Sequence, residues 1–214
     1  MLSAVDTFAD IGCDHGYCSE YMLKNKLCAH ATITDISADC LKKAEILLKE
    51  YVEQGVCTPL CTNGLKGVDK NTNLVLIAGM GGMEIAHILT AKDGFIPERF
   101  VFQPMRDAAA VRKILTVRGA KIERDFTFYD GKFYDVIVGE RNGGTGNYTE
   151  NYTEAEFLFG RDNIRERGED FLNFLHAEIK KRKEILSRPL GETARANAEE
   201  KLKYLQGVES GEIK

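Results

Sequence analysis

The stretch AKIERDFTFYDGKFYDVIVGER, residues 120–141, decides between the folds that the rest of the sequence allows. It contains two runs in which apolar and polar residues alternate, and Asp130-Gly131 stands at their junction. Asp-Gly between two such runs is the strongest short-range signal for a β-hairpin. We therefore expect the sheet to finish with an antiparallel strand.

Before this hairpin, strand and helix patterns alternate. Strands are predicted near 7–12, 30–35, 57–61, 73–79 and 99–103, and helices near 15–26, 38–54, 81–91 and 106–118. Ser37 is placed to cap the second helix, and Gly55 follows its expected end. The alternation predicts an α/β fold with right-handed crossovers and a mostly parallel sheet. A doubly wound sheet closed by a hairpin is the arrangement of S-adenosylmethionine-dependent methyltransferases, whereas nicotinamide-binding domains are parallel throughout.

After the hairpin the pattern changes. The glycine-rich segment GERNGGTGNYTENYTE leads into a helical region, which gives predicted domains at 1–141 and 154–214 joined by a linker at 142–153. Pro189 to Gly191 interrupts the helical pattern, so two helices are expected to pair as a coiled-coil-like hairpin. This tail could pack on its own domain or on a partner subunit, or it could contact substrate. The sequence leaves these alternatives open.

The composition is that of a soluble globular protein, with 214 residues, 43% hydrophobic and 29% charged. No apolar run approaches the roughly 18 residues of a membrane span. The first residues lack a secretory signal, which favours a cytoplasmic protein. All six cysteines lie within the first 61 residues without C-x-x-C spacing, so we expect reduced structural thiols and no metal site.

The net charge of −4 argues against a nucleic-acid partner, but the charge is unevenly distributed. Residues 97–133 contain 8 basic and 5 acidic residues, a balance of +3, whereas residues 1–96 contain 8 basic and 12 acidic residues, a balance of −4. A local basic face on an acidic protein can still bind phosphates.

The stretch FADIGCDHGYC, residues 8–18, occupies the first predicted strand-to-helix turn. It is not G-x-G-x-x-G, because its glycines are four residues apart. A dinucleotide site needs bare N–H groups at the helix start, and Asp14 would repel a pyrophosphate there. S-adenosylmethionine instead carries a sulfonium and an ammonium group, which favour nearby carboxylates. The acidic turn therefore favours the methyl donor, with a tight turn in which Asp14 caps the helix as the alternative.

Two later strand ends agree with this interpretation. Asp35 ends the second strand, where an acid can hydrogen-bond ribose hydroxyls. Asn63-Gly64 follows the third strand, where an amide can meet the adenine amino group and a glycine lets the base lie close.

Taken together, ADIGCDHGY, IAGMGG, FQPMRDAAAVRKIL and GKFYDVIV resemble the bacterial tRNA (adenine-N1)-methyltransferase family that modifies adenine 22 in the D arm. The resemblance implies a class I methyltransferase domain, a C-terminal coiled-coil-like domain, S-adenosylmethionine as donor and tRNA as substrate. The implied donor-binding residues are Asp10, Gly12, Asp14, His15, Gly16, Asp35, Ile36, Asn63, Gly64, Ala78 and Gly79. Gly79 to Gly82 and Gln103-Pro104 would line the target-base pocket. Methyltransferases often have an acid where Asn63 stands.

The bare strand end in LVLIAGMGGMEI, residues 74–85, suits methylation at adenine N1. This nitrogen has an in-plane lone pair and no hydrogen, so no general base is required and positioning is the main task. The predicted catalytic set is Asp14, Gly79, Met80, Gly81 and Gln103. Asp14 would stabilise the positive charge that passes to the ring. Alternatively, the glycines only allow tight strand–helix packing, and Gln103 only pins the Pro104 turn.

Because N1 lies on the pairing edge, the base must be unpaired or flipped out. The residues suited to phosphate contacts are Arg106, Arg112, Lys113, Arg118, Lys121 and Arg124. Three other functions stay open: a methyltransferase of small molecules or proteins, an NAD-dependent oxidoreductase, and a non-catalytic RNA-binding module. A monomer is favoured over an oligomer.

Overall fold

The computed structural model describes residues 2–142 and 151–214 and divides the chain into two compact units. The first comprises Met1–Arg124 and Val136–Glu150, and the second comprises Asp125–Asp135 and Asn151–Lys214. Residues 125–135, which the sequence analysis placed in the first domain, thus group with the C-terminal unit. The predicted linker at 142–153 falls largely on residues 143–150, which lie outside the described residues.

Strands and helices alternate up to the hairpin, as the sequence predicted. The elements are β1 (Val5–Ile11), α1 (Tyr17–Lys24), β2 (Cys28–Asp35), α2 (Ala38–Leu47), α3 (Lys49–Glu53), β3 (Cys57–Cys61), β4 (Leu74–Met80), α4 (Gly82–Thr90), β5 (Arg99–Pro104), α5 (Ala108–Val117), β6 (Lys121–Asp130) and β7 (Lys132–Glu140). The Ser37 Oγ accepts a hydrogen bond from the Cys40 N–H, which confirms the predicted cap. The predicted helix at 38–54 is divided at Leu48, where ψ is 15° and the side chain is fully buried.

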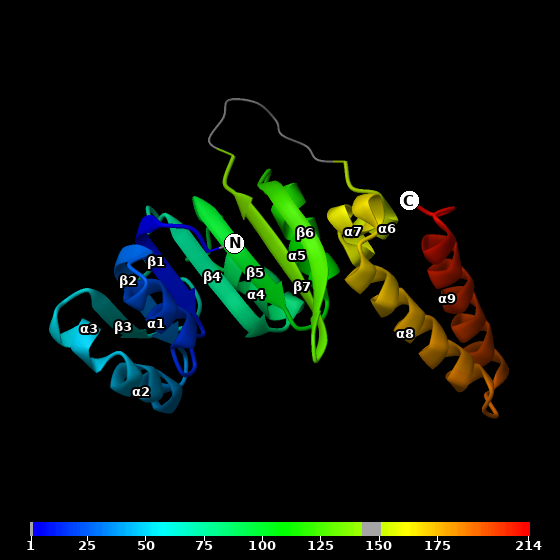
Figure 1. The fold of residues 1–214 in the computed structure, drawn as a ribbon, viewed down its shortest axis with the longest axis horizontal. Helices are drawn as coiled ribbons and strands as arrows, with labels where there is room; N and C mark the ends of the chain where they lie inside the picture. Colours follow the sequence, from blue (N-terminus) through cyan, green and yellow to red (C-terminus); the bar gives the residue numbers. More distant parts are fainter. Residues whose placement is uncertain (1, 143–150) are drawn as a thin grey trace. The chain divides into compact units, whose positions relative to one another are not determined.

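The seven strands form one sheet in the order β3-β2-β1-β4-β5-β7-β6 (Figure 1). β7 pairs antiparallel with β5, while the pairs among β1 to β5 are parallel. The predicted hairpin is therefore confirmed. The strand order reverses between β1 and β4, and sheets of this type bind ligands outside the carboxyl ends of the strands at that point.

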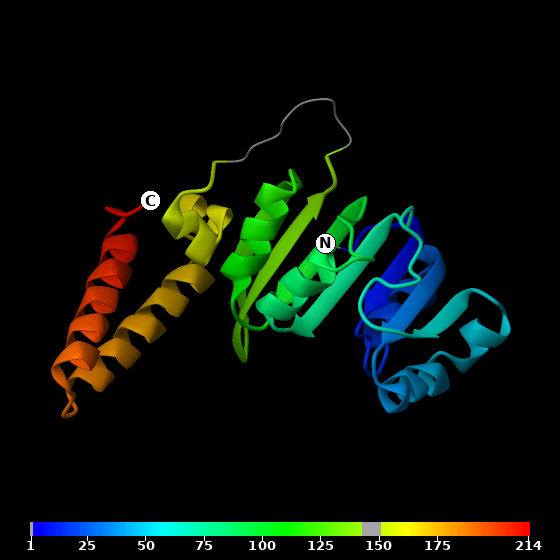
Figure 2. The same ribbon diagram turned by 180° about the vertical axis from the view of Figure 1, so that it is seen from behind.

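The central strands of the first unit are buried on both faces, which explains their continuous apolar sequence. Leu74 to Ile77 of β4 are at most 4% exposed, and Phe100 and Phe102 of β5 are 0% exposed. Helices α4 and α5 cover one face of the sheet (Figure 2), and α1 packs on the opposite face against β1 and β2. This packing fixes the strand ends that carry the predicted site.

The second unit contains four helices within its described residues: α6 (Glu154–Phe159), α7 (Arg161–Glu166), α8 (Glu169–Leu186) and α9 (Glu192–Ser210). The first predicted tail helix is therefore three helices, because Gly160 (φ +95°) and Arg167 (φ +54°) have backbone conformations that end a helix. Helices α8 and α9 pair as predicted. Their core consists of Phe171, Leu175, Ile179, Leu205 and Val208, with Ala155 and Ile164 from the preceding helices.

Within the second unit, side chains from α7 and α8 bind the backbone of β6. The N–H groups of residues 125, 127 and 129 donate to Asp162 Oδ2 (3.0 Å), Asn163 Oδ1 (3.0 Å) and Asp170 Oδ2 (3.1 Å), respectively. These are alternate residues of the last strand in the sheet, so their N–H groups point away from β7. We call Asp162, Asn163 and Asp170 the edge ladder.

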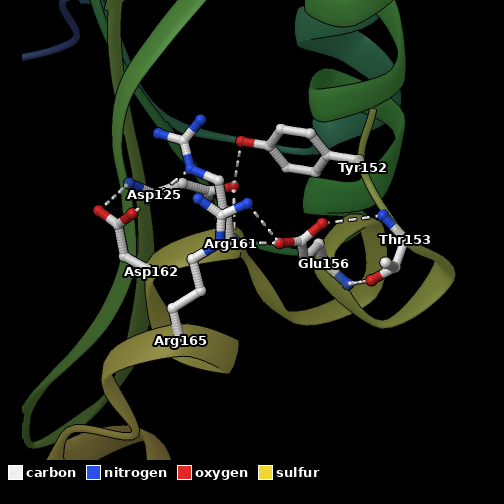
Figure 3. A network of polar contacts seen from close by, with 7 residues as sticks. All are labelled: Asp125, Tyr152, Thr153, Glu156, Arg161, Asp162 and Arg165. Carbon is white, nitrogen blue, oxygen red and sulfur yellow. Dashed lines mark hydrogen bonds and ion pairs between the residues drawn. The ribbon is translucent and has the colours of Figure 1, made fainter. Parts of the chain in front are cut away.

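A buried polar network continues from this ladder (Figure 3). The Asp125 carboxylate, 0% exposed, accepts from the Tyr152 hydroxyl at 3.2 Å and from the Arg161 N–H at 3.3 Å. Glu156 forms a capping box with Thr153. Because buried carboxylates are costly unless paired, these contacts fix how β6 and the α6–α7 segment fold together.

Candidate functional site

The first turn of the site is bound to the end of β2. The N–H groups of Gly12 and Cys13 both donate to the Thr34 carbonyl oxygen, at 2.8 and 2.9 Å. The Asp14 N–H donates to Asp35 Oδ2 at 3.2 Å. The structure thus brings together the acids that the sequence placed at successive strand ends.

Asp14 extends from this turn with an exposed carboxylate. Its Oδ2 lies 2.8 Å from His15 Nδ1, and its Oδ1 lies 3.8 Å from Lys43 Nζ. The hydrogen bond from His15 is the main cause that lowers the pKa of Asp14. The His15 ring also stacks on Tyr17 with a centroid distance of 5.5 Å. The site therefore presents a carboxylate that stays ionised at neutral pH.

Asp10 has a different environment from Asp14. It is 5% exposed, and the Ser19 hydroxyl donates to its Oδ2 at 2.8 Å. Burial raises the pKa of Asp10 to about 6. Its contact with Ser19 joins the end of β1 to α1, so its local role is to position the turn. Sequence reasoning missed Ser19, although a hydroxyl in the first turn of α1 was the available signal.

The end of β2 presents an acid beside an exposed apolar side chain. Asp35 accepts from the Asp14 N–H through Oδ2 and from the Ser37 N–H through Oδ1, the latter at 2.8 Å. Both oxygens keep a lone pair for a further donor. Ile36, the next residue, is 72% exposed. An oriented carboxylate next to an apolar surface is suited to a sugar that carries a flat ring.

Asn63 and Gly64 line a cavity of about 300 Å³ between the loop after β3 and the end of α4. The sequence analysis expected Gly64 to leave room for a base. In the structure that room is filled by Ile88, because a Cβ on Gly64 would lie 2.9 Å from Ile88 Cγ2. Gly16 is likewise a packing position, beside Ala44 and Leu48 of α2.

The bare end of β4 is a β-bulge. Ala78 pairs with Gln103, and the register then shifts so that Met80 pairs with Pro104. Gly79 is the extra residue, at φ +79°, and a Cβ there would meet nothing within 4 Å. The Gly79 N–H donates to Gln103 Oε1 at 3.0 Å. The Gln103 side chain therefore fixes the bulge.

The segments that follow β4 and β5 are also joined by backbone hydrogen bonds. The Met105 N–H donates to the Met80 carbonyl, and the Gly82 N–H donates to the Arg106 carbonyl, both at 2.8 Å. A Cβ on Gly82 would collide with the Asp107 carbonyl. The tight-packing interpretation thus holds for Gly82, whereas the space beside Gly79 is open. Sequence reasoning missed Met105, whose Sδ lies 3.6 Å from Gln103 Nε2.

Met80 connects this bulge to the first turn. A Cβ built on Gly12, which has φ +70°, would collide with the end of the Met80 side chain. Gly81 lies beside Arg106, whose Nε would be 3.5 Å from an added Cβ. The first turn, the bulge and the β5 end therefore form one continuous surface.

The residues predicted to contact phosphates differ in how accessible their side chains are. Arg112 is 0% exposed, so its guanidinium is not available to a phosphate, and its assignment as an RNA contact is wrong. The Lys121 Nζ lies 2.9 Å from Glu140 Oε1, and this hydrogen bond raises the pKa of the lysine. Arg118 donates to the Leu89 carbonyl at 3.1 Å. Lys113 is exposed, as is Arg106, whose side chain is 81% exposed.

Two further groups of residues bear on the chemistry of the site. All six cysteines are free thiols, and burial raises the pKa of Cys13, in the first turn, to about 12. Cys13 is therefore a protonated thiol at neutral pH. Across residues 2–142 and 151–214, no group of three His, Cys, Asp or Glu side chains could hold a metal ion. None of the helices in those ranges is long and apolar enough to cross a membrane.

Comparison with known proteins adds a second line of information. A sequence model of the tRNA (adenine(22)-N(1))-methyltransferase family matches residues 8–209. The tRNA (adenine(22)-N(1))-methyltransferase of Bacillus subtilis is 32% identical over 171 residues, which cover 77% of this chain and 71% of that protein.

Solved structures with the same fold include two described as TrmK. The B. subtilis m1A22 tRNA methyltransferase TrmK has a TM-score of 0.79 at 25% identity, covering 95% of this chain and 92% of that one. The M. capricolum TrmK in complex with S-adenosyl-homocysteine has a TM-score of 0.82 at 20% identity, covering 98% and 92%. These similarities extend over both units.

Proposed function

This chain belongs to the tRNA (adenine(22)-N(1))-methyltransferase family, and on this premise we propose that it transfers a methyl group from S-adenosylmethionine to N1 of adenine 22 in the D arm of tRNA. The observation that carries the residue assignment is the hydrogen bond between the Asp14 N–H and Asp35. It joins an acidic, glycine-containing turn to a second acid at the strand-order reversal, where this fold binds its ligands.

The residues at this position fit the proposed donor. Asp35 has both oxygens oriented by backbone N–H groups and can accept from ribose hydroxyls through its free lone pairs. Ile36 offers an exposed apolar surface to the adenine ring. The ionised Asp14 carboxylate suits a cationic ligand, whereas it would repel a diphosphate. S-adenosylmethionine, when bound, supplies the electrophilic methyl group.

The open space beside Gly79 is the proposed position of the target base. A flat ring can approach this backbone closely because nothing projects from it. The Gly79 N–H already donates to Gln103, so Gln103 is a positioning residue that holds the backbone at Gly79 in place. We call this stretch of backbone, with the open space beside it, the base shelf. Adenine N1 carries no hydrogen, so no proton acceptor is needed, and orienting its lone pair toward the methyl can contribute about 7–11 kcal/mol.

Asp14 is the proposed stabiliser of product charge. Methylation moves positive charge from sulfur to the adenine ring, and a nearby carboxylate favours that state. Because its pKa is lowered, Asp14 carries this charge at neutral pH. Arg106, exposed beside Gly81, is the proposed phosphate contact nearest to the base. As a tRNA-modifying enzyme, the protein is expected to act in the cytoplasm.

The proposal is tested by incubating the protein with methyl-labelled S-adenosylmethionine and tRNA, followed by nucleoside mass mapping. We expect 1-methyladenosine at position 22, and we expect the Asp14→Asn variant to lose most of this activity. The Lys24→Ala variant, on the far end of α1, is the matched control. Label that appears only at adenine N6, on a small molecule or protein, or nowhere would contradict the proposal.

A further inference from the structure

The tip of the β6–β7 hairpin presents an aromatic face. Phe128 and Tyr134 are opposite each other on the two strands, and their rings stack with a centroid distance of 5.3 Å and an interplanar angle of 17°. The Lys132 Nζ lies 5.0 Å from the centroid of the Tyr134 ring. Phe128 and Tyr134 are partly exposed, and Lys132 is exposed. We call these three residues the tip platform.

The opposite face of the same tip serves as its anchor. Tyr129 and Phe133 contact each other at 5.0 Å, and the Phe133 ring meets the edge of Phe174 in α8 at 5.5 Å. The edge ladder holds the N–H groups of residues 125, 127 and 129. Because alternate residues of a strand point to opposite faces, this anchoring leaves the tip platform on the other side.

The platform is therefore held by contacts on its opposite face and open at its end. At Gly131 an added Cβ would meet nothing within 4 Å, and Asp130 and Gly131 are exposed. A ring that is held in place before a ligand arrives loses little conformational entropy on binding. Accessible aromatic rings with a neighbouring cation are the chemistry that binds unpaired nucleobases.

We propose that the tip platform stacks an unpaired nucleobase of the tRNA substrate, with Lys132 contacting an adjacent phosphate. This inference rests on the proposed function. Unpaired bases of a folded tRNA can lack a stacking partner, and an aromatic face on the enzyme can supply one. The Asp130 carboxylate lies at the same turn, so stacking rather than net charge is expected to dominate.

The test uses three variants of the full chain and tRNA binding at several salt concentrations. Tyr134→Leu and Phe128→Leu keep apolar volume but remove a ring, so each is expected to weaken tRNA binding roughly 5-fold or more without changing its salt slope. Lys132→Ala should instead reduce the slope by about one. The affinity for S-adenosylmethionine should not change. Tyr51→Leu, at a partly exposed position of α3 outside the hairpin, is the matched control and should bind tRNA as the wild type does.

A second measurement needs no variant. Ultraviolet irradiation of the wild-type protein bound to tRNA should cross-link a nucleotide to Phe128 or Tyr134, as located by peptide mass spectrometry. Unchanged tRNA affinity in both leucine variants, or cross-links found only outside the hairpin, would overturn the platform. Methylation of adenine 22 by the wild type would still support the proposed function in that case, so the two failures are distinguishable.

Discussion

Asp14 and Asp10 show how two carboxylates four residues apart acquire opposite properties. Asp14 is exposed and hydrogen-bonded to His15, which lowers its pKa, while burial raises the pKa of Asp10 to about 6. The exposed acid therefore supplies a permanent charge. The buried acid is held in the ionised state at neutral pH at the expense of folding stability.

Replacing Asp10 with Asn should stabilise the protein at neutral pH. The folded-state pKa of Asp10 lies above the usual value of 3.8, so the folded protein binds more protons than the unfolded chain between these values. Stability contributed by the protonated form is thus present below pH 4 and lost as pH rises through 6. At pH 7.5 the variant should gain up to about 3 kcal/mol in its free energy of unfolding.

Urea unfolding between pH 4 and 8 measures this effect. The gain should shrink toward zero at the acidic end of the series. A variant that is less stable than the wild type at pH 7.5 would show that the hydrogen bond from Ser19 outweighs the burial of the charge.

A comparison with Gly55 can distinguish a role of Gly79 in methyl transfer from the backbone strain that alanine causes at any glycine with positive φ. The two have φ of +79° and +74°, and an added Cβ would meet nothing within 4 Å at either position. Each alanine variant should therefore lose about 1–2 kcal/mol of stability from backbone strain. Only Gly79→Ala places a methyl group on the proposed base shelf, so only that variant should lose methyl transfer, by about 10- to 100-fold. Equal activity in the two variants would show that the open space beside Gly79 is not needed for methyl transfer.

The sequence identified which residues meet at the site better than it identified what each one does. Strand ends gather at one sheet edge, so Asp14, Asp35 and Gly79 could be placed together from the pattern alone. The contacts of Gly64 with Ile88 and of Gln103 with Gly79 depend on side-chain distances between elements that are remote in the sequence. No local pattern reports such distances.

At the level of elements, the hairpin was predictable and the burial of Arg112 was misjudged. Asp130-Gly131 acts locally, and the structure has the expected turn. Arg112 was assigned to the surface because it is charged. In α5, however, it lies four residues after Ala108 and three before Leu115, both buried, so the helical spacing places it on the inner face.

The edge ladder gives a prediction about the hairpin and the tail helices. Asn163 accepts from the Thr127 N–H at 3.0 Å and donates to the Thr127 hydroxyl at 2.7 Å. Asn163→Ala leaves this partly buried N–H without its side-chain partner, which should lower the free energy of unfolding by about 1–3 kcal/mol. Hydrogen exchange should speed up at Thr127 in particular.

Asn173→Ala, at an exposed position of α8, is the control for that experiment. It should leave both stability and the exchange rate of Thr127 unchanged. If Asn163→Ala behaves in the same way, water replaces the side chain and the ladder is not needed for stability.

For the whole molecule, the question is how a protein with a net charge of −4 binds a polyanion. Burial and ion pairing leave few of the predicted phosphate contacts available near the site. In the tail, Lys180, Lys181 and Lys183 are exposed within about one turn near the end of α8, which gives that helix a basic end.

Replacing Lys180, Lys181 and Lys183 with Ala together should weaken tRNA binding and reduce its salt slope by about 2 to 3. Methyl transfer at saturating tRNA should not change, because no lysine of the tail belongs to the proposed site. The measurement is tRNA affinity against salt concentration. An unchanged slope would show that the basic end of α8 does not contact RNA and would favour packing against another surface.

The division of the chain also has an evolutionary consequence. Residues 125–135 belong to the C-terminal unit, so the polypeptide passes between the two units three times rather than once. Recombination or gene fusion at 142–153 would separate the tail helices from the strand whose N–H groups they bind. We therefore expect that the helical tail cannot be transferred to another protein without the hairpin. Proteins that have the tail should also have the hairpin.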